Sequence, residues 1–498
     1  MKPIRSILAA AAMALAVTTA APLLAEAAPR TDVIIGMVLE PPHLDPTAGA
    51  AAAIKEVGYA NIFEGITRIG PDGQVQPGLA ESWDVSEDGK TYTFKLRTGA
   101  KFHDGTPFSA DDVKFSIDRA MAEDSVNPQK GLYSAIETVE VVDPATVVVT
   151  LKHPQGAFLW NMGWGEAAIV SPATADNNKE HPVGTGPFKF DGWAKGSSIK
   201  LVKNPDYWGE EVALDRAEFR IIPDAAAAVP ALLSGDVHAF SNMPAGDALP
   251  QVQADSRFKV VIGSTEGETV LSTNNKKEPF DKLQVRQAIA HALNRDEIIA
   301  GASSGLGVPI GSHFAPHHPA YVDLTGTYPH DTNRAKELLA EAGLPDGFSA
   351  TLKLPPPPYA REAGEIIASE LRQVGINLEI IPLEWADWLK QVFADKDYDL
   401  SIISHVEPND INIYARPDYY FQYQNPEFNA VMDELEVTVD DAKRNELYGK
   451  AQRILAEDAA VGFLFQMPKV GVWDAKLEGM WENWPLSVAD LTKVHWTE

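Results

Sequence analysis

Residues 78–121 read GLAESWDVSEDGKTYTFKLRTGAKFHDGTPFSADDVKFSIDRAM, and this stretch predicts a β-hairpin followed by a capped helix. An Asp88-Gly89 pair separates two alternating segments, which is a strong hairpin signal. In the second segment, apolar residues at every second position from Tyr92 onward leave one face free to be buried. Ser109, with Asp112 three residues later, is typical of a capping box at a helix start. The stretch therefore indicates strands and a helix that share one core.

The length and charge of the chain limit its possible partners. With 498 residues it is too long for one small core, so two or three domains are expected. The formal net charge is -28, which argues against nucleic acid or an anionic membrane surface as a partner, because both require basic patches. The hydrophobic share of 45% is that of an ordinary globular protein.

Residues 1–27 are expected to be a signal peptide. Lys2 and Arg5 form a basic start, residues 7–17 are apolar, and Ala25-Glu26-Ala27 fits a cleavage site. The mature protein is therefore expected to be exported and soluble. The chain has no cysteine, so it has no lipid anchor attached through cysteine, no disulfide and no thiol-based metal site or catalysis.

Strands and helices alternate along the rest of the chain, which predicts α/β domains. Strand-rich pieces near both ends indicate that the domains are not consecutive segments. The expected strands include 138–142, 146–151, 219–222, 258–262, 269–273, 350–354, 377–382, 400–404 and 463–473. The expected helices include 54–63, 225–234, 334–342, 360–374, 385–394 and 443–457. A further helical region is expected at 280–300, with an interruption near 294–296.

Five segments together resemble the family 5 extracellular solute-binding proteins, the dipeptide-, oligopeptide- and nickel-type receptors of bacterial ABC importers. They are residues 78–119, the P-x-x-L-D-P loop at 41–46, V-G-T-G-P-F at 183–188, N-x-x-Y-W-G at 204–209, and P-F-x4-V-R-Q-A-I-x2-A-x2-R at 279–295. The likeness covers nearly the whole mature chain, which makes it more specific than any single motif.

This resemblance implies an α/β, bilobed periplasmic-binding-protein fold (type II, cluster C-like) with an extra inserted domain. Lobe I would comprise 31–75, 186–265 and 475–498, the inserted domain 76–185, and lobe II 266–474. The resemblance further implies a monomeric periplasmic receptor that needs no cofactor and catalyses no reaction. Its partners would be the ABC permease and ATPase subunits in the inner membrane.

Two parts of the chain are candidates for contacting the solute. Trp160 and Trp164 lie in a glycine-bearing stretch between strands, within the domain that the resemblance puts near the cleft, and could stack on a ligand. The second part follows the predicted strand 400–404, because clefts in α/β proteins form at the carboxyl ends of strands. Its candidates are His405, Glu407, Asp410, Tyr414 and Arg416.

The second part departs from the pattern of the peptide-binding relatives. In those proteins a tryptophan and then an aspartate commonly stand here, and the aspartate pairs with the α-amino group of the peptide. Here His405 replaces the tryptophan, and Glu407 or Asp410 is the nearest acid. The planar guanidinium of Arg416 could bind two oxygens of a carboxylate or phosphate at once. The expected solutes are, in order, a short peptide or amino-acid conjugate, an oligosaccharide or opine-like solute, and a nickel chelate.

Two motifs suggest other functions but lack the required context. Gly301-Ala302-Ser303-Ser304-Gly305 matches the G-x-S-x-G of a secreted hydrolase, but a nucleophile elbow follows a strand and here a helix is expected before it. His313, His317 and His318 could hold a metal on a helix face, but Pro316 and Pro319 forbid a helix. We therefore predict a polar loop and no metal site.

Overall fold

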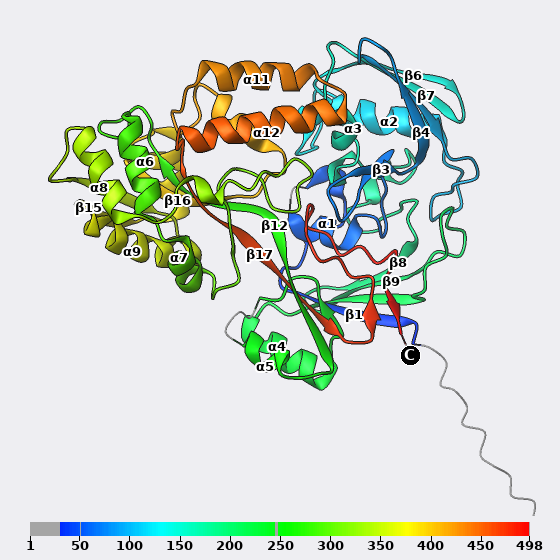
Figure 1. The fold of residues 1–498 in the computed structure, drawn as a ribbon. Coiled ribbons are helices and arrows are strands. Elements are labelled where there is room, and N and C mark those ends of the chain that lie inside the picture. Colours follow the sequence, from blue (N-terminus) through cyan, green and yellow to red (C-terminus); the bar gives the residue numbers. More distant parts are fainter. Residues whose placement is uncertain (1–29, 50, 245–247, 498) are drawn as a thin grey trace, which may run out of the picture.

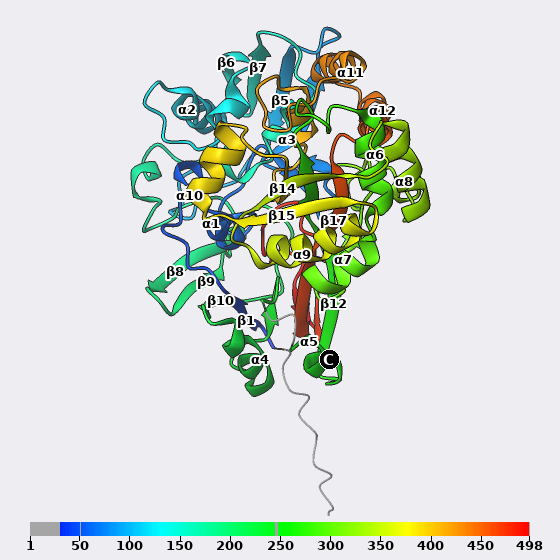
Figure 2. The same ribbon diagram turned by 90° about the vertical axis from the view of Figure 1, so that its left-hand side faces the viewer.

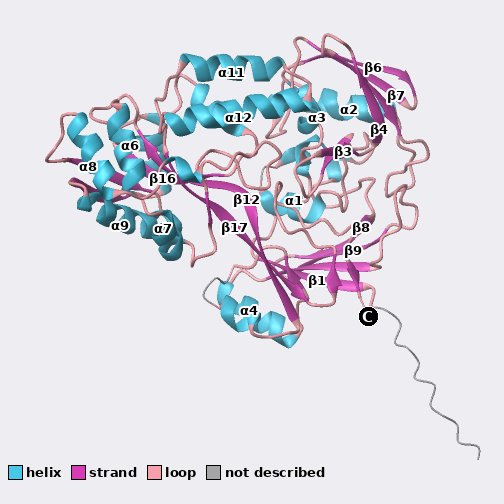
Figure 3. Cartoon of the chain, in the orientation of Figure 1, coloured by secondary structure: helices cyan, strands magenta, loops and turns pink. Residues whose placement is uncertain are grey.

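The computed structural model describes residues 30–49, 51–244 and 248–497, so the predicted signal peptide lies outside the described residues. An eleven-stranded mixed sheet runs through the molecule (Figures 1 and 3). Its strands are β1 (Asp32–Met37), β8 (Phe188–Ala194), β9 (Ser198–Lys203), β10 (Arg216–Ile221), β11 (Ala239–Phe240), β12 (Phe258–Thr273), β13 (Val308–Pro309), β14 (Phe348–Leu354), β15 (Ile376–Pro382), β16 (Leu400–His405) and β17 (Gly462–Asp474). Their order is β15-β14-β16-β12-β17-β11-β1-β10-β9-β8, and β13 pairs with β17 off this path.

Two long strands, β12 and β17, join the two ends of this sheet. They pair antiparallel from Phe258 opposite Asp474 to Leu271 opposite Gly462, with an irregular register between Ser264 and Glu268. The prediction of separate strands at 258–262 and 269–273 is wrong, because the polar stretch between them stays within one strand. The strand also runs through residue 266, where a lobe boundary was predicted; the division into domains stays a prediction.

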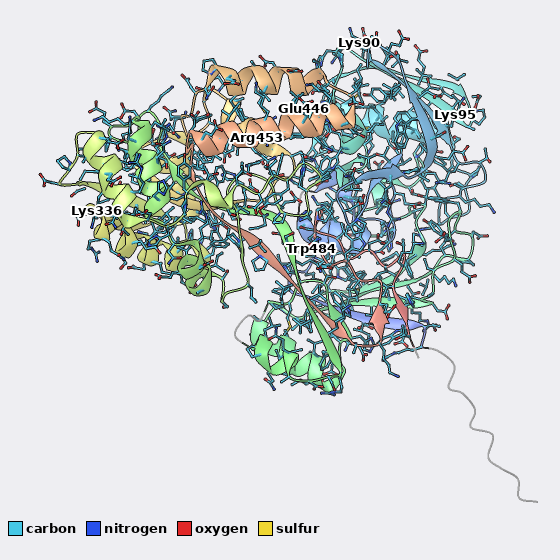
Figure 4. The ribbon with its side chains drawn as sticks, in the orientation of Figure 1. Lys90, Lys95, Lys336, Glu446, Arg453 and Trp484 are labelled. Carbon is cyan, nitrogen blue, oxygen red and sulfur yellow. The ribbon has the colours of Figure 1, made fainter. Side chains whose placement is uncertain are left out.

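The C-terminal segment supports the middle of β12. The backbone N–H of Trp484, labelled in Figure 4, donates to the carbonyl of Ser264 at 2.8 Å. The Asn483 side chain accepts from the N–H of Ser264 at 3.0 Å. A Cβ at Gly263 would lie 2.0 Å from the carbonyl oxygen of Glu482, so only glycine allows this approach.

A separate four-stranded sheet, in the order β4-β5-β7-β6, carries the stretch quoted first. Its elements are β4 (Ala80–Val85), β5 (Thr91–Leu96), β6 (Ile136–Asp143), β7 (Thr146–Leu151) and the covering helix α2 (Ala110–Met121). The predicted hairpin is confirmed, with Trp83 opposite Phe94 and Gly89 at a positive φ of 68°. The Asp112 carboxylate accepts from the N–H of Ser109 at 2.9 Å, which confirms the predicted helix start.

Helices cover the β14–β15–β16 end of the large sheet, whose edge strands face the viewer in Figure 2. They are α6 (Leu283–Ala292), α7 (Arg295–Ala302), α8 (Thr332–Glu341) and α9 (Pro358–Gln373). The predicted break near Asn294 is confirmed, and its side chain caps α7 through the N–H of Glu297. Helix α12 (Asp441–Glu457) was predicted, whereas α11 (Pro426–Val437) was not.

The remaining elements are short. They are α1 (Ala52–Gly58), α3 (Phe158–Asn161), α4 (Ala225–Ser234), α5 (Leu249–Gln253), α10 (Trp385–Trp388), β2 (Thr67–Ile69), β3 (Val75–Pro77), β18 (Leu477–Glu478) and β19 (His495–Trp496). Helix α1 ends five residues before the end of the predicted helix 54–63. A π-helical turn, 389–394, continues α10 within the predicted helix 385–394.

The end of α11 and its connection to α12 contact the segment that follows β7 (Figure 1). The N–H of Gly156 donates to the carbonyl of Glu436 at 2.8 Å. The guanidinium of Arg444, which is 9% exposed, donates to the carbonyls of Leu435 and Thr438 and fills the space beside Gly156. The two ends of the molecule therefore meet at a second place, away from β12 and β17.

The V-G-T-G-P-F motif at 183–188 fits closely against the backbone after α1. The N–H groups of Gly186 and Phe188 donate to the carbonyls of Ile62 and Asn61 at 3.0 and 2.9 Å. A Cβ at Gly184 would lie 1.9 Å from the carbonyl oxygen of Ile62. The atoms around Gly184 belong to the backbone, so no flexible side chain can move aside to make room for a Cβ.

We expect Gly184→Ala to lower the free energy of unfolding by about 1–3 kcal/mol, the usual cost of overpacking. Chemical denaturation measures the effect. Gly326→Ala is the matched control, because a Cβ there meets no atom within 4 Å. Equal stability of the two variants would contradict the importance of this close approach.

Candidate functional site

A cavity of about 490 Å³ lies between the region after α2 and the segment that follows β16. One wall is formed by residues between 129 and 164, and the other by residues between 393 and 448. A neighbouring cavity of about 420 Å³ shares Trp160, Asn409 and Tyr448 with it. Two parts of the chain that are distant in sequence therefore enclose a space of the size that small-molecule sites have.

Trp160 and Trp164 both line the cavity, as hypothesised from the sequence. Helix α3 carries Trp160, and the two indole rings lie with their centroids 4.8 Å apart. The Lys55 ammonium lies 5.0 Å from the centroid of the Trp164 ring and 3.0 Å from the Glu166 carboxylate. The cation and the buried carboxylate hold this wall in place.

Glu407, Asp410 and Arg416 line the opposite wall. Glu407 is exposed, whereas Asp410 accepts a hydrogen bond from His313 Nε2 at 2.8 Å. The Arg416 guanidinium donates to Asn412 Oδ1 at 2.8 Å and remains exposed to the cavity. The wall thus presents a free carboxylate and a guanidinium within ten residues of chain.

His405 lines the cavity, but Tyr414 does not. His405 Nε2 lies 3.1 Å from the Tyr420 hydroxyl, and burial lowers the pKa of His405 to about 4, so the ring is neutral at pH 7. Tyr414 is 1% exposed and stacks on Phe421, with the ring centroids 5.0 Å apart. It supports the wall from behind.

Several lining residues were not predicted. They are mostly apolar or aromatic and come from both walls: Leu132, Phe393, Tyr419, Met432 and Tyr448. Met432 lies on α11, a helix that the sequence analysis did not predict. Nothing in the local sequence distinguishes these side chains from ordinary core residues.

The loop with His313, His317 and His318 is irregular, as predicted, but its histidines are buried rather than solvated. His313 Nδ1 lies 3.2 Å from Glu268 Oε1, and His317 bonds to Glu266. Both acids come from the part of β12 that was predicted to be a loop. Recognising one continuous strand would have put the two glutamates, two residues apart, on the same face.

The G-x-S-x-G motif has no catalytic geometry. Helix α7 precedes Ser303, as expected. The Ser303 hydroxyl donates to the carbonyl of Ile299 at 3.1 Å and accepts from the N–H of Gly307 at 3.0 Å. Both interactions close the end of the helix, so the serine serves a structural purpose.

Two α/β halves with a cavity between them define a solute-binding protein of the bilobed class. Residues 74–430 match the bacterial extracellular solute-binding proteins, family 5 Middle, and the chain belongs to this family. Among the described residues, no helix combines the length and apolar character that crossing a bilayer requires.

Named relatives agree with this assignment. The chain is 32% identical to the dipeptide-binding protein of Escherichia coli, over 78% of this chain and 80% of that protein. It is 30% identical to heme-binding protein A of Haemophilus influenzae, over 80% and 81% of the two chains. The structure of the periplasmic binding protein DppA from Helicobacter pylori in complex with the peptide STSA superposes with a TM-score of 0.75, 28% identity and coverage of 94% and 99%.

The neutral state of His405 makes the stability of the protein depend on pH. Because its pKa is about 4 in the folded protein and about 6.5 when unfolded, the unfolded chain binds the proton more readily. Its contribution is therefore present above pH 6.5 and lost as the pH falls toward 4. Between pH 7.5 and 4.5, we expect wild-type protein to lose about 1–2 kcal/mol more stability than His405→Gln, allowing for its partial exposure.

Urea denaturation at a series of pH values measures this difference. The exposed His153→Gln variant should follow the wild-type dependence. If His405→Gln also followed it, the imidazole would not be held neutral.

Proposed function

We propose that the protein captures a short peptide or an amino-acid conjugate in the 490 Å³ cavity and delivers it to an ABC importer. The observation that carries the proposal is the wall formed by Glu407 and Arg416 opposite Trp160 and Trp164. A short peptide has an ammonium group at one end and a carboxylate at the other, which match this pair of charges. The indole rings offer apolar contact that does not depend on one particular side chain.

Glu407 is the first candidate for the ammonium group. Asp410 already accepts a hydrogen bond from His313, whereas the exposed Glu407 carboxylate forms no ion pair or hydrogen bond with the described residues. Arg416 is the first candidate for the carboxylate, because its planar guanidinium can bind both oxygens at once. The likeness to the E. coli dipeptide-binding protein and to the peptide-bound H. pylori protein supports a peptide as the solute.

Capture requires no chemistry on the solute. A ligand that touches both walls is bound more tightly when they approach, so it shifts the population toward the closed arrangement. In this proposal the protein is a periplasmic monomer exported by residues 1–27, without a lipid anchor, and the permease and ATPase of an importer recognise its closed form. The structural use of the Ser303 hydroxyl argues against a hydrolase.

Mass spectrometry of solute released from protein purified without refolding tests the proposal. We expect peptides or amino-acid conjugates, followed by saturable binding of the same compounds to the stripped protein. Recovery of an oligosaccharide, an opine-like solute or a metal chelate would replace the proposed ligand class. Turnover of the recovered solute by purified protein would contradict a receptor without enzymatic activity.

Glu407→Gln and Arg416→Gln should each weaken binding of the recovered peptide about tenfold, or ~1.4 kcal/mol, because each removes one charged contact at an exposed site. Isothermal titration calorimetry measures the affinities. Glu341→Gln, at an exposed carboxylate on α8, is the control and should bind as the wild type does. Unchanged affinity in both cavity variants would remove these residues from the site.

A further inference from the structure

Three metal-ligating side chains meet behind the cavity wall. Glu268 comes from β12, His313 from the loop after β13, and Asp410 from the segment after β16. One ligand atom from each lies within 4.8 Å of the other two. Glu268 and His313 are 4% and 2% exposed, while Asp410 lines the cavity. Two of the three side chains are therefore buried, and the third borders the cavity.

Polar atoms in this cluster lack partners. Glu268 Oε1 and His313 Nδ1 are buried without a hydrogen bond within the described part of the chain, although they lie 3.2 Å apart. The hydroxyl of Tyr414 is likewise buried and unpartnered, and its ring centroid lies 5.4 Å from that of His313. Buried polar groups nearly always have a partner, so three exceptions at one place call for a bound species.

The charges around the cluster have one sign. Glu268 is buried, and the carboxylates of Asp410, Glu266 and Glu407 are the charged groups that act on it. No lysine or arginine forms an ion pair with Glu268 or Asp410 among the described residues. A buried group of this kind is stable only if a proton or a cation compensates the repulsion.

We propose that Glu268, His313 and Asp410 bind one divalent transition-metal ion. Two carboxylates and one imidazole form a ligand set that suits Zn²⁺ and its first-row neighbours. Zinc bonds of about 2.0–2.2 Å put tetrahedral ligand atoms roughly 3.3 Å apart, so the three side chains draw together when the ion enters. A fourth position remains open on the side of Asp410, toward the cavity.

The ion would connect one strand and two loop segments through their side chains. It ties the loop that holds His313 and the segment after β16 to the strand that carries Glu268. That segment also presents Glu407 and Arg416, so metal binding fixes the wall that contacts the solute. The inference concerns the frame of the cavity and is independent of the chemical class of the solute.

Calorimetric titration of chelator-treated protein with Zn²⁺ tests the proposal. We expect one saturable site, and a loss of affinity on the order of 100-fold in each of Glu268→Gln, His313→Gln and Asp410→Asn. Zn²⁺ should also raise the thermal midpoint of the wild type but not of the variants. Asp410→Asn is the most informative, because its side chain is the most exposed of the three and its replacement disturbs the interior least.

His317→Gln is the matched control, because His317 is a buried histidine of the same loop that pairs with a single glutamate of the same strand. It should bind Zn²⁺ as the wild type does. Absence of a saturable site, or equal Zn²⁺ affinity in wild type and Asp410→Asn, would overturn the proposal in favour of a metal-free contact of His313 with the two carboxylates. Titration of the metal-free protein with peptide keeps this outcome separate from a failure of the proposed solute.

Discussion

The backbone hydrogen bonds between β12 and β17 are the constraint on which the rest of the molecule depends. In the described sheet path these two long strands, together with the two-residue strand β11, connect the β14–β15–β16 end to the β1–β8–β9–β10 end. A two-stranded ribbon resists stretching because its backbones are already extended, and its cross-strand hydrogen bonds hold the two strands together, but it twists readily. The irregular register between Ser264 and Glu268 lies in the part of the ribbon between the two ends.

The same part of the ribbon carries the polar groups next to the cavity. Glu266 and Glu268 contact the histidines of the neighbouring loop, and Trp484 and Asn483 bind the strand at Ser264. The strand β12 thus joins the two halves, and it also supplies Glu266 and Glu268, which lie behind the segment after β16. A change that disturbs its register would affect both at once.

Local structure could be predicted well from the sequence. The hairpin at Asp88-Gly89, the helix start at Ser109 and the break at Asn294 depend on neighbouring residues, and the structure confirms them. The continuity of β12 could not be predicted, because residues 263–268 are polar and their pairing with β17 is set by residues some 200 positions away. Polar residues inside a strand look like a loop until their partners are known.

In the candidate site, too, the features set by neighbouring residues could be predicted, and those set by distant residues could not. Both predicted tryptophans, His405 at the end of β16 and three predicted residues after that strand line the cavity, because a position at the end of a strand indicates where a cleft can form. Tyr414 was grouped with them through proximity in sequence, yet the 3₁₀ turn at Asp410–Ala415 directs it into the core. The acids that flank His313 come from two distant segments, so only the fold reveals that Glu268 and Asp410 stand on either side of it.

The hydrogen bond between Gly156 and Glu436 has a mechanical consequence. A rigid body attached at two separated places keeps one easy motion, which is rotation about the line through both attachments. The ribbon of β12 and β17 supplies one attachment, and the contact beside Arg444 supplies the other. Rotation about this line can separate the two walls with both attachments intact, whereas a translation of one half away from the other must break the contact at Gly156.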